Sequence, residues 1–258
     1  MFQVVNVWYS THSEGDIMQR EFDISKYKPF KDLKGQCKFK SLTERKMSWP
    51  KIENKYILDN EYMLRPIKED ELEKVVEIYR EGYPDLYGNP EYDHVLWPDR
   101  LLKELQSENG FMKGDRLLIV VEKLDEKKLV GAAIIKIDVG NMSINWRHGV
   151  IHPAYRGNKI FKEMSIYLDK ISEDTGAEYG TLLAVTFHKA TQKVVEELGW
   201  KMRGIFPGAV LTWNYEDKYC RGTPVYFDKF YNGGEELVPK EMELTPKIES
   251  VLECLKGV

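Results

Sequence analysis

Hydrophobic residues recur between 62 and 110 at spacings that predict one strand and two helices. A short extended segment, 62–66, comes first. One buried helix face then follows, formed by Leu72, Val75, Val76 and Tyr79. Gly82-Tyr83-Pro84 is a stop signal directly after this face. A second helix that ends by Gly110 is indicated by Leu101, Leu102 and Leu105.

The pattern then changes to apolar runs of strand length. Such runs cover 116–122, 129–137 and 143–151, and the polar LDEKK stretch between the first two fits a hairpin. A helix face follows, with Phe161, Met164, Leu168 and Ile171, and then a buried strand over 181–186. A shorter helix over 189–198 and strands near 201–213 and 224–230 complete the body. The predicted order, β α α β β β α β α β β, is a mixed sheet with packed helices, in the α/β or α+β class.

The two ends of the chain differ from this body. We interpret residues 1–60, which have no clean period, as an N-terminal extension packed on a main domain at 61–235. Residues 236–258 are then a C-terminal helical tail, in which the apolar positions Ile248, Val251, Leu252 and Leu255 predict an amphipathic helix. Residues 20–56 hold 11 Lys or Arg against 5 Asp or Glu, in a 258-residue chain of net charge −4. This basic segment could bind an anionic ligand or pack on its own domain.

Composition excludes several classes of protein. An overall negative charge argues against nucleic acid as the main partner. No apolar run approaches the ~18 residues of a membrane helix, and the Met1 end lacks a signal-peptide pattern. Cys37, Cys220 and Cys254 are too few and too scattered for a disulfide framework or a zinc site. We therefore expect a cytoplasmic protein that needs no metal and no membrane, as a monomer or a homodimer.

The stretch GVIHPAYRGNKIFKEM, residues 149–164, holds the clearest chemistry. A strand ends, Pro153 and Gly157 impose a tight turn, and a helix begins at once. The first N–H groups of a helix have no intrahelical partner and lie at the positive end of its dipole, so they can bind a phosphate. Arg156 adds a forked cationic donor, and Gly157 lets the backbone approach closely. The alternative is an ordinary strand–turn–helix unit with a surface arginine.

This stretch resembles the acyl-CoA-binding motif of the GNAT N-acetyltransferase superfamily, V-x-P-x-[YF]-[RQ]-x-x-G-x-[GA]. The matching positions are Val150 or Ile151, Pro153, Tyr155 and Arg156. LRP at 64–66 and EELGW at 196–200 also resemble family elements, so the likeness spans about 62–230 in the family's order. A closer likeness is to a branch that reads Y-G-N/D and then A-V-T-x-H-x-x-[ST]-Q-K, here 87–89 and 184–193.

The resemblance implies a mixed, mostly antiparallel sheet with splayed central strands and flanking helices. It also implies transfer of an acetyl or other short acyl group from acetyl-CoA or another acyl-CoA to a small-molecule amine. The residues it assigns to the coenzyme are Gly149, Val150, Ile151, Arg156, Gly157, Asn158, Lys159, Ile160, Phe161, His188 and Gln192.

Several positions depart from the family pattern. Lys159 stands at the motif's glycine and Phe161 at its Gly/Ala, so lysine adds charge there and we expect the phenylalanine to turn into the core. In many relatives a strand glutamate is the base and a helix tyrosine protonates the leaving sulfur. Arg147 or Asn145 occupies the glutamate position here, and Val195 the tyrosine position.

Histidines are the remaining base candidates, because imidazole titrates near ~6.5. We name His148 and His188 as catalytic candidates. His148 could instead be a hydrogen-bonded sheet residue, and His188 a coenzyme contact, since its position touches the coenzyme arm in many relatives. His94, next to Asp93, is a third candidate.

An aromatic cluster stands where this family forms its acceptor wall, and we assign Tyr83, Tyr87, Tyr92 and Trp97 to substrate binding. Such a cage can hold an amine or an acyl chain, although these rings could also be plain core. Two rival functions remain. The domain could bind acyl-CoA as a sensor or partner module without turnover, or it could use a longer acyl-CoA or an acyl carrier, which the basic segment would attract.

Overall fold

The computed structural model describes residues 35–213, 216 and 218–256. Residues 1–34, the first part of the predicted extension, lie outside this range. The helices are α1 (Leu72–Gly82), α2 (Pro98–Leu105), α3 (Ile160–Asp174), α4 (Ala190–Glu197) and α5 (Pro246–Lys256). The strands are β1 (Lys55–Ile57), β2 (Tyr62–Pro66), β3 (Gln106–Ser107), β4 (Gly110–Phe111), β5 (Arg116–Lys123), β6 (Lys128–Asp138), β7 (Ser143–Ile151), β8 (Tyr179–Ala184), β9 (Lys201–Ile205), β10 (Val210–Trp213), β11 (Tyr219–Gly222) and β12 (Val225–Phe230).

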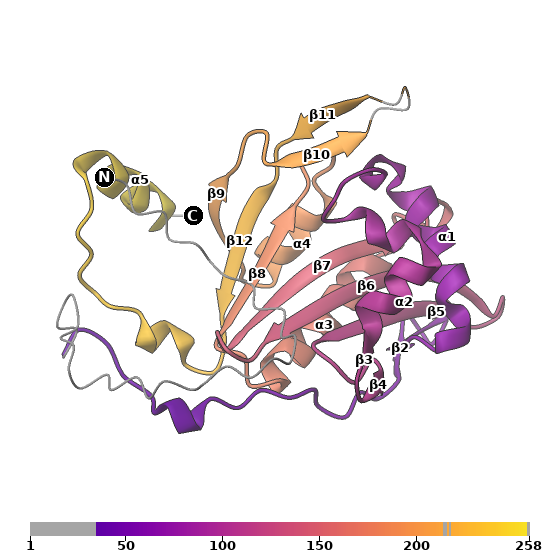
Figure 1. Ribbon diagram of the computed structural model, residues 1–258, viewed down its shortest axis with the longest axis horizontal. Helices are drawn as coiled ribbons and strands as arrows, with labels where there is room; N and C mark the ends of the chain where they lie inside the picture. The colour runs from indigo at the N-terminus through magenta and orange to yellow at the C-terminus, as the bar shows by residue number, and fades with distance from the viewer. Residues whose placement is uncertain (1–34, 214–215, 217, 257–258) are drawn as a thin grey trace, which may run out of the picture. The chain divides into compact units, whose positions relative to one another are not determined.

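The main sheet runs in the order β1-β2-β5-β6-β7-β8-β12-β9 (Figure 1). Every neighbouring pair in it is antiparallel except β7 and β8, which are parallel. A parallel pair needs a crossover, and α3 supplies it. The predicted class, a mixed and mostly antiparallel sheet with flanking helices, is therefore confirmed.

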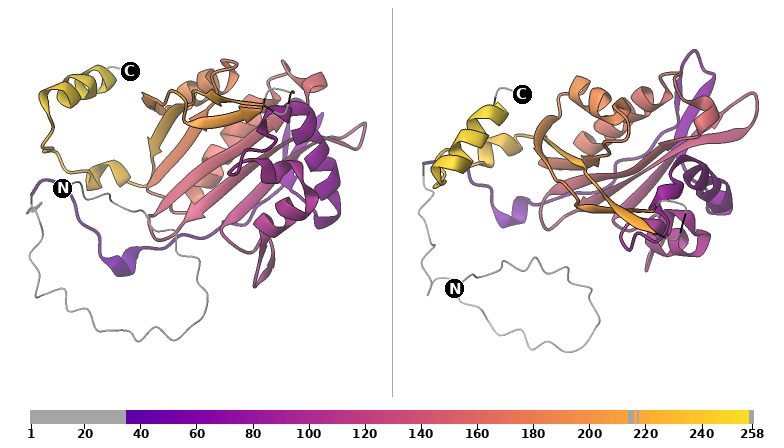
Figure 2. Two further views of the ribbon diagram at one scale, coloured as in Figure 1. Left: turned by 45° about the horizontal axis from the view of Figure 1, so that its top comes forward. Right: turned by 90° about the horizontal axis from the view of Figure 1, so that it is seen from above.

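Two hydrophobic clusters cover the two faces of this sheet. α1 and α2 pack on one face through residues such as Val75, Tyr79 and Leu101. α3 and α4 pack on the other through residues such as Met164 and Val195. Figure 2 shows the two helix pairs on opposite sides. Both clusters draw on alternate residues of β5 and β6, as expected for strands covered on both faces.

One predicted strand, 201–213, is wrong. The chain forms two strands there, β9 in the main sheet and β10 in a separate pair with β11. Pro207-Gly208 separates them, and Gly208 has a φ of 73° that suits glycine. The predicted strand over 181–186 begins and ends two residues earlier, as β8. The helix predicted in the C-terminal tail is present as α5.

The described part of the basic segment packs on the body of the protein. Trp49 donates from Nε1 to the Gly114 carbonyl at 2.9 Å, and β1 pairs with β2. Lys38 and Lys40 form ion pairs of 2.7 Å with Glu236 and Glu178. Within its described part, some of this segment's charge is therefore paired with the domain's own carboxylates.

Candidate active site

The site lies where β7 and β8 separate. They pair in register from Ser143 opposite Tyr179 to Trp146 opposite Leu182, and no further. β7 continues to Ile151 and stays paired with β6 on its other side. The β8-facing edge of 147–151 therefore has no strand partner among the described residues. Side chains bind the carbonyls of His148, Gly149 and Ile151, so this edge could offer a ligand its N–H groups.

A β-bulge marks the start of this open edge. His148 and Gly149 together stand opposite the single residue Ala133. His148 has a φ of 49°, an uncommon value for a residue with a side chain. The bulge brings the consecutive side chains of Arg147 and His148 into contact with the same loop, through Glu91 and Tyr92.

Two tyrosines of the α1 region hold the bulge in place. Tyr79 donates to the His148 carbonyl at 2.6 Å, and Tyr83 donates to the Gly149 carbonyl at 3.0 Å. Burial raises the pKa of both phenols, so both stay protonated and able to donate. Tyr83, predicted from the sequence to bind the substrate, is a structural support of β7 in this structure.

The turn after β7 is open to solvent. Arg156, Gly157, Asn158 and Lys159 are exposed, and a Cβ at Gly157 would meet no atom within 4 Å. Lys159 caps α3 with a φ of 61°, a conformation that glycine adopts more readily. Within the described residues, no acceptor engages the amide N–H groups of Gly157, Asn158 and Lys159. The turn therefore fits an anionic group such as a pyrophosphate.

The Arg156 side chain binds main-chain carbonyls of the protein, whereas a side chain free to bind phosphate was expected. Its Nε donates to the Ile151 carbonyl and its Nη2 to the Gly82 carbonyl, each at 3.1 Å. A guanidinium has five N–H donors, so donors remain beyond these two bonds. Arg156 thus ties the end of α1 to the end of β7, beside the exposed amides.

The other predicted coenzyme residues fall into two groups. Ile160 is 1% exposed, and the Phe161 ring would lie 3.2 Å from a Cβ at Gly149, so both side chains belong to the packing under the turn, as expected for Phe161. On the far side of the opening, Gln192 donates to the Val185 carbonyl at 3.0 Å and so fixes the chain after β8. His188 lies between Val185 and Gln192 in the sequence, and its side chain is exposed.

The groups around His188 shift its pKa in opposite directions. Partial loss of solvation lowers its pKa, the Arg156 charge lowers it further, and a backbone hydrogen bond and Asp85 raise it. Burial raises the pKa of Asp85, which His188 partly offsets. The imidazole is therefore neutral at pH 7 and able to accept a proton, next to a carboxyl group that the sequence did not single out.

His148 lies on the other side of the opened strand, in an aromatic surround. Its ring centroid is 4.9 Å from that of His94 and 5.4 Å from that of Tyr92. Burial, and then the neighbouring His94, lower its pKa well below the usual value. Its Nε2 is buried with no hydrogen-bond partner among the described residues. His148 is consequently a neutral, enclosed imidazole, whereas His188 is open to solvent.

The predicted acceptor wall is assembled from the loop between α1 and α2. Tyr87 lies 6.3 Å from Trp97 and 5.2 Å from Trp213 between ring centroids. Trp97 is stacked by Arg100, whose charge lies 5.4 Å from the ring centroid. Tyr83, Tyr87, Tyr92 and Trp97 therefore belong to one loop region, although they do not all face one another.

Sequence analysis missed Asn89 and Trp213, which join this loop to β10. Asn89 donates from Nδ2 to the Leu211 carbonyl at 2.7 Å. The Y-G-N stretch at 87–89 contained a signal for Asn89, but no local pattern links it to a residue more than 120 positions away.

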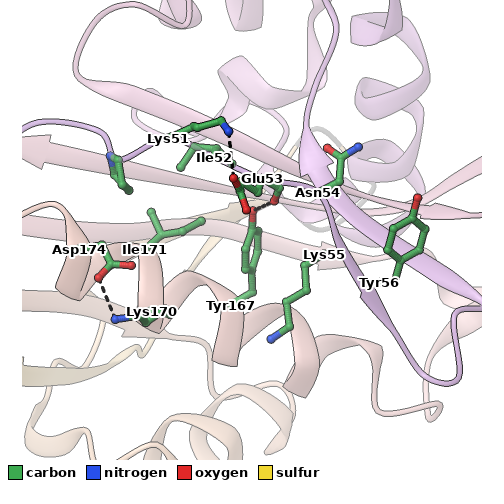
Figure 3. A pocket seen from close by; sticks show the side chains of 11 residues that line it. Lys51, Ile52, Glu53, Asn54, Lys55, Tyr56, Tyr167, Lys170, Ile171 and Asp174 are labelled. Atoms are coloured by element: carbon green, nitrogen blue, oxygen red, sulfur yellow. Dashed lines mark hydrogen bonds and ion pairs between the residues drawn. The ribbon is translucent and has the colours of Figure 1, made fainter.

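A separate cavity of about 530 Å³ lies between residues 50–56 and the carboxyl half of α3 (Figure 3). Four of its charged groups are paired with one another, Lys51 with Glu53 and Lys170 with Asp174, and Lys55 lies over the Tyr167 ring. It lies beside the carboxyl half of α3, whereas the turn at 157–159 precedes the amino end of this helix. Among the described residues, no group of three or more His, Cys, Asp or Glu side chains is placed to hold a metal ion. None of the described helices is long and apolar enough to cross a bilayer.

No protein-family model and no curated sequence matches the chain. Solved structures do match it. A ribosomal-protein-S5-alanine acetyltransferase from Vibrio fischeri aligns over 72% of this chain and 100% of its own, with a TM-score of 0.53 and 13% identity. A GNAT-family protein from Chromobacterium violaceum aligns over 75% and 93%, with a TM-score of 0.52 and 15% identity. The chain has the GNAT fold.

A further GNAT-fold structure, a spermidine N-acetyltransferase variant from Vibrio cholerae, aligns over 67% of this chain and 96% of its own, with a TM-score of 0.51 and 14% identity. By their names, one of these neighbours acts on a ribosomal protein and another on a small polyamine. The GNAT fold therefore does not by itself select between the two kinds of acceptor.

Proposed function

We propose that this protein transfers an acetyl or other short acyl group from coenzyme A to the amine of a small molecule. The observation that carries the proposal is the opening between β7 and β8, which lies directly beside the exposed amides of 157–159. An acyl-CoA needs both features, because its pantetheine arm can add hydrogen bonds to an open strand edge and its pyrophosphate requires main-chain donors.

In this arrangement each part of the site has a distinct role. Gly157, Asn158 and Lys159 would bind the pyrophosphate, and Arg156 would hold the turn and add positive charge. The N–H groups of the open edge between Gly149 and Ile151 would align the pantetheine arm, because the carbonyls of these two residues already accept from Tyr83 and Arg156. When the amine attacks the thioester carbonyl of bound acyl-CoA, the amide C–N bond would form and the C–S bond would break. Coenzyme A would leave as the thiol, which takes up the proton removed from the amine.

Proton removal from the amine falls to His188. An alkyl amine has a pKa near ~10.4, so a base that is neutral at pH 7 is needed near the reacting nitrogen. The pKa of His188 is lowered, and the imidazole is exposed at the end of β8. Asp85 would orient the ring and stabilise its charged form. His148 is enclosed by aromatic rings, and we assign it to the positioning of the bulge.

The test is thiol release from acetyl-CoA against a panel of small primary amines. We expect turnover on at least one amine, and a loss of about 10²- to 10⁴-fold in kcat for His188→Ala, the usual value of general-base help. His148→Gln should keep most of its kcat. Tight binding of coenzyme A without turnover on any amine would contradict transfer and support the sensor alternative.

The acyl-carrier alternative depends on a free basic segment. Lys38 and Lys40, in the described part of that segment, pair instead with carboxylates of the same domain. This pairing favours free coenzyme A as the donor. Retained activity after neutralisation of these two lysines would agree with that choice.

A further inference from the structure

The β10–β11 hairpin is attached to the loop between α1 and α2 by one buried asparagine. Asn89 is 4% exposed, and both ends of its amide are engaged. Its Nδ2 donates to the Leu211 carbonyl at 2.7 Å. Its Oδ1 accepts from the amides of Glu91 and Tyr92 at 2.9 and 3.1 Å. Asn89 therefore shapes its own loop with one atom and holds β10 with the other.

Ring contact strengthens the same attachment. Tyr87 lies 5.2 Å from Trp213, the last residue of β10, between ring centroids. Tyr87 and Asn89 are separated only by Gly88, which has a φ of 72° and so can make the reversal that brings both side chains to β10. The Y-G-N stretch thus has a structural role in this chain, since it forms the contact surface for the hairpin.

The other end of the hairpin is fixed on the opposite side of the opening. Arg221 donates to the Gly208 carbonyl at 2.9 Å, and Phe206 donates to the Pro224 carbonyl at 3.0 Å. Gly222 lies against the ring of Phe187, which follows β8. Figure 1 shows β10 and β11 crossing from the β9–β12 side of the sheet to the α1 side, past the ends of β7 and β8.

We propose that this hairpin, held by Asn89, bridges the acceptor side of the opening and restricts the acceptor to a free small-molecule amine. The inference rests on the proposed function and deepens it. A polypeptide acceptor needs an open groove for the chain attached to its amine, on both sides of a lysine and on one side of an N-terminus. A bridge fixed at both ends closes that route, whereas a small amine has no attached chain to accommodate.

Asn89→Asp separates the two roles of the side chain. A carboxylate keeps the acceptor that Glu91 and Tyr92 use, but it has no N–H for Leu211 and places an oxygen against that carbonyl. Asn54→Asp is the matched control. It makes the same chemical change at an exposed residue whose side chain has no hydrogen bond in the described part of the chain.

The first measurement is amide hydrogen exchange over 208–222, which does not depend on activity. Loss of a buried hydrogen bond corresponds to about a tenfold or larger acceleration of exchange in the hairpin of Asn89→Asp. Asn54→Asp should exchange as the wild type does. Unchanged exchange in Asn89→Asp would overturn the bridge.

The second measurement identifies products. The protein is incubated with acetyl-CoA and two acceptor pools, one of free amino acids and di- and polyamines and one of 15-residue peptides with free N-termini and lysines, and products are detected by mass spectrometry. We expect acetylated small amines only, and for Asn89→Asp a KM raised about tenfold with peptide products appearing. Acetylated peptides from the wild type would overturn the restriction. If neither pool reacts while exchange accelerates as expected, acyl transfer fails and the bridge stands.

Discussion

The two halves of β7 are neighbours on one strand and yet have different physical roles. From Ser143 to Trp146 the strand is paired on both sides, and Ile144 is 1% exposed in the core. From Arg147 to Ile151 it is paired on one side only, contains a bulge, and has His148 at a φ of 49°. The first half stabilises the sheet, and the second half lacks pairing on one side and has an irregular backbone, as we propose for a strand edge that presents groups to a ligand.

The largest expected effect is on the free energy of unfolding, and it distinguishes the two halves of β7. Ile144→Ala removes buried methyl groups from the fully paired half and should lower the free energy of unfolding by about 2–5 kcal/mol. Because Ile144 is remote from the turn, the Kd for coenzyme A should be unchanged under folding conditions. Chemical denaturation and calorimetric titration measure the two quantities. A parallel loss of coenzyme affinity would show that the halves do not act independently.

Charge reversal in the turn should affect the Kd for coenzyme A more than the free energy of unfolding. Arg156→Glu loses the bonds to Ile151 and Gly82 and places a negative charge beside the proposed pyrophosphate. The Kd for coenzyme A should rise about 30- to 100-fold, the equivalent of one strong charge-assisted hydrogen bond. Lys170→Glu, at the far end of the same helix, is the control and should leave the Kd unchanged. Equal Kd values for Arg156→Glu and wild type would remove Arg156 from the site.

The buried imidazole of the bulge should appear in the pH dependence of stability. Burial lowers the pKa of His148 in the folded state, so below about pH 6.5 the unfolded chain binds a proton that the folded one does not. Stability therefore falls as pH falls through this range, by up to ~1.4 kcal/mol per pH unit for this group. His148→Gln should flatten the slope. A slope identical to that of the wild type would mean that His148 takes up its proton without cost.

The smallest effect concerns the packing beneath the turn. Gly149→Ala places a Cβ 3.2 Å from the Phe161 ring, which must shift by a few tenths of an ångström. The cost should be about 1 kcal/mol, and Phe161→Leu in the same chain should relieve it. Thermal unfolding of the single and double variants measures the coupling. Additive losses would contradict direct contact between the two positions.

The sequence allowed most of the fold to be predicted, because periodicity reports local burial. The bounds of β7 match the apolar run from Ser143 to Ile151, and α1 ends at the predicted Gly-Tyr-Pro signal. The strand predicted across Pro207-Gly208 failed because hydrophobicity continues through a turn that sends β10 to another sheet. Periodicity describes neighbours along the chain, and the path of a hairpin depends on distant contacts.

The candidate site was predicted in part for the same reason. Motif spacing indicated the exposed turn at 157–159, because the N–H groups of this turn are placed by residues that are neighbours in the sequence. It did not indicate that Arg156 binds two main-chain carbonyls, that Asp85 acts on His188, or that Asn89 holds Leu211. Each of these depends on segments brought together by the sheet, at sequence separations that no local pattern encodes.

The most direct test of the phosphate-binding turn is a titration of the ¹⁵N-labelled protein with coenzyme A and, separately, with pantetheine, which has no pyrophosphate. We expect coenzyme A to shift the amide resonances of Gly157, Asn158 and Lys159 strongly and to protect them from exchange, while pantetheine shifts only residues 149–151. Undisturbed amides at 157–159 in the presence of saturating coenzyme A would contradict the proposed site.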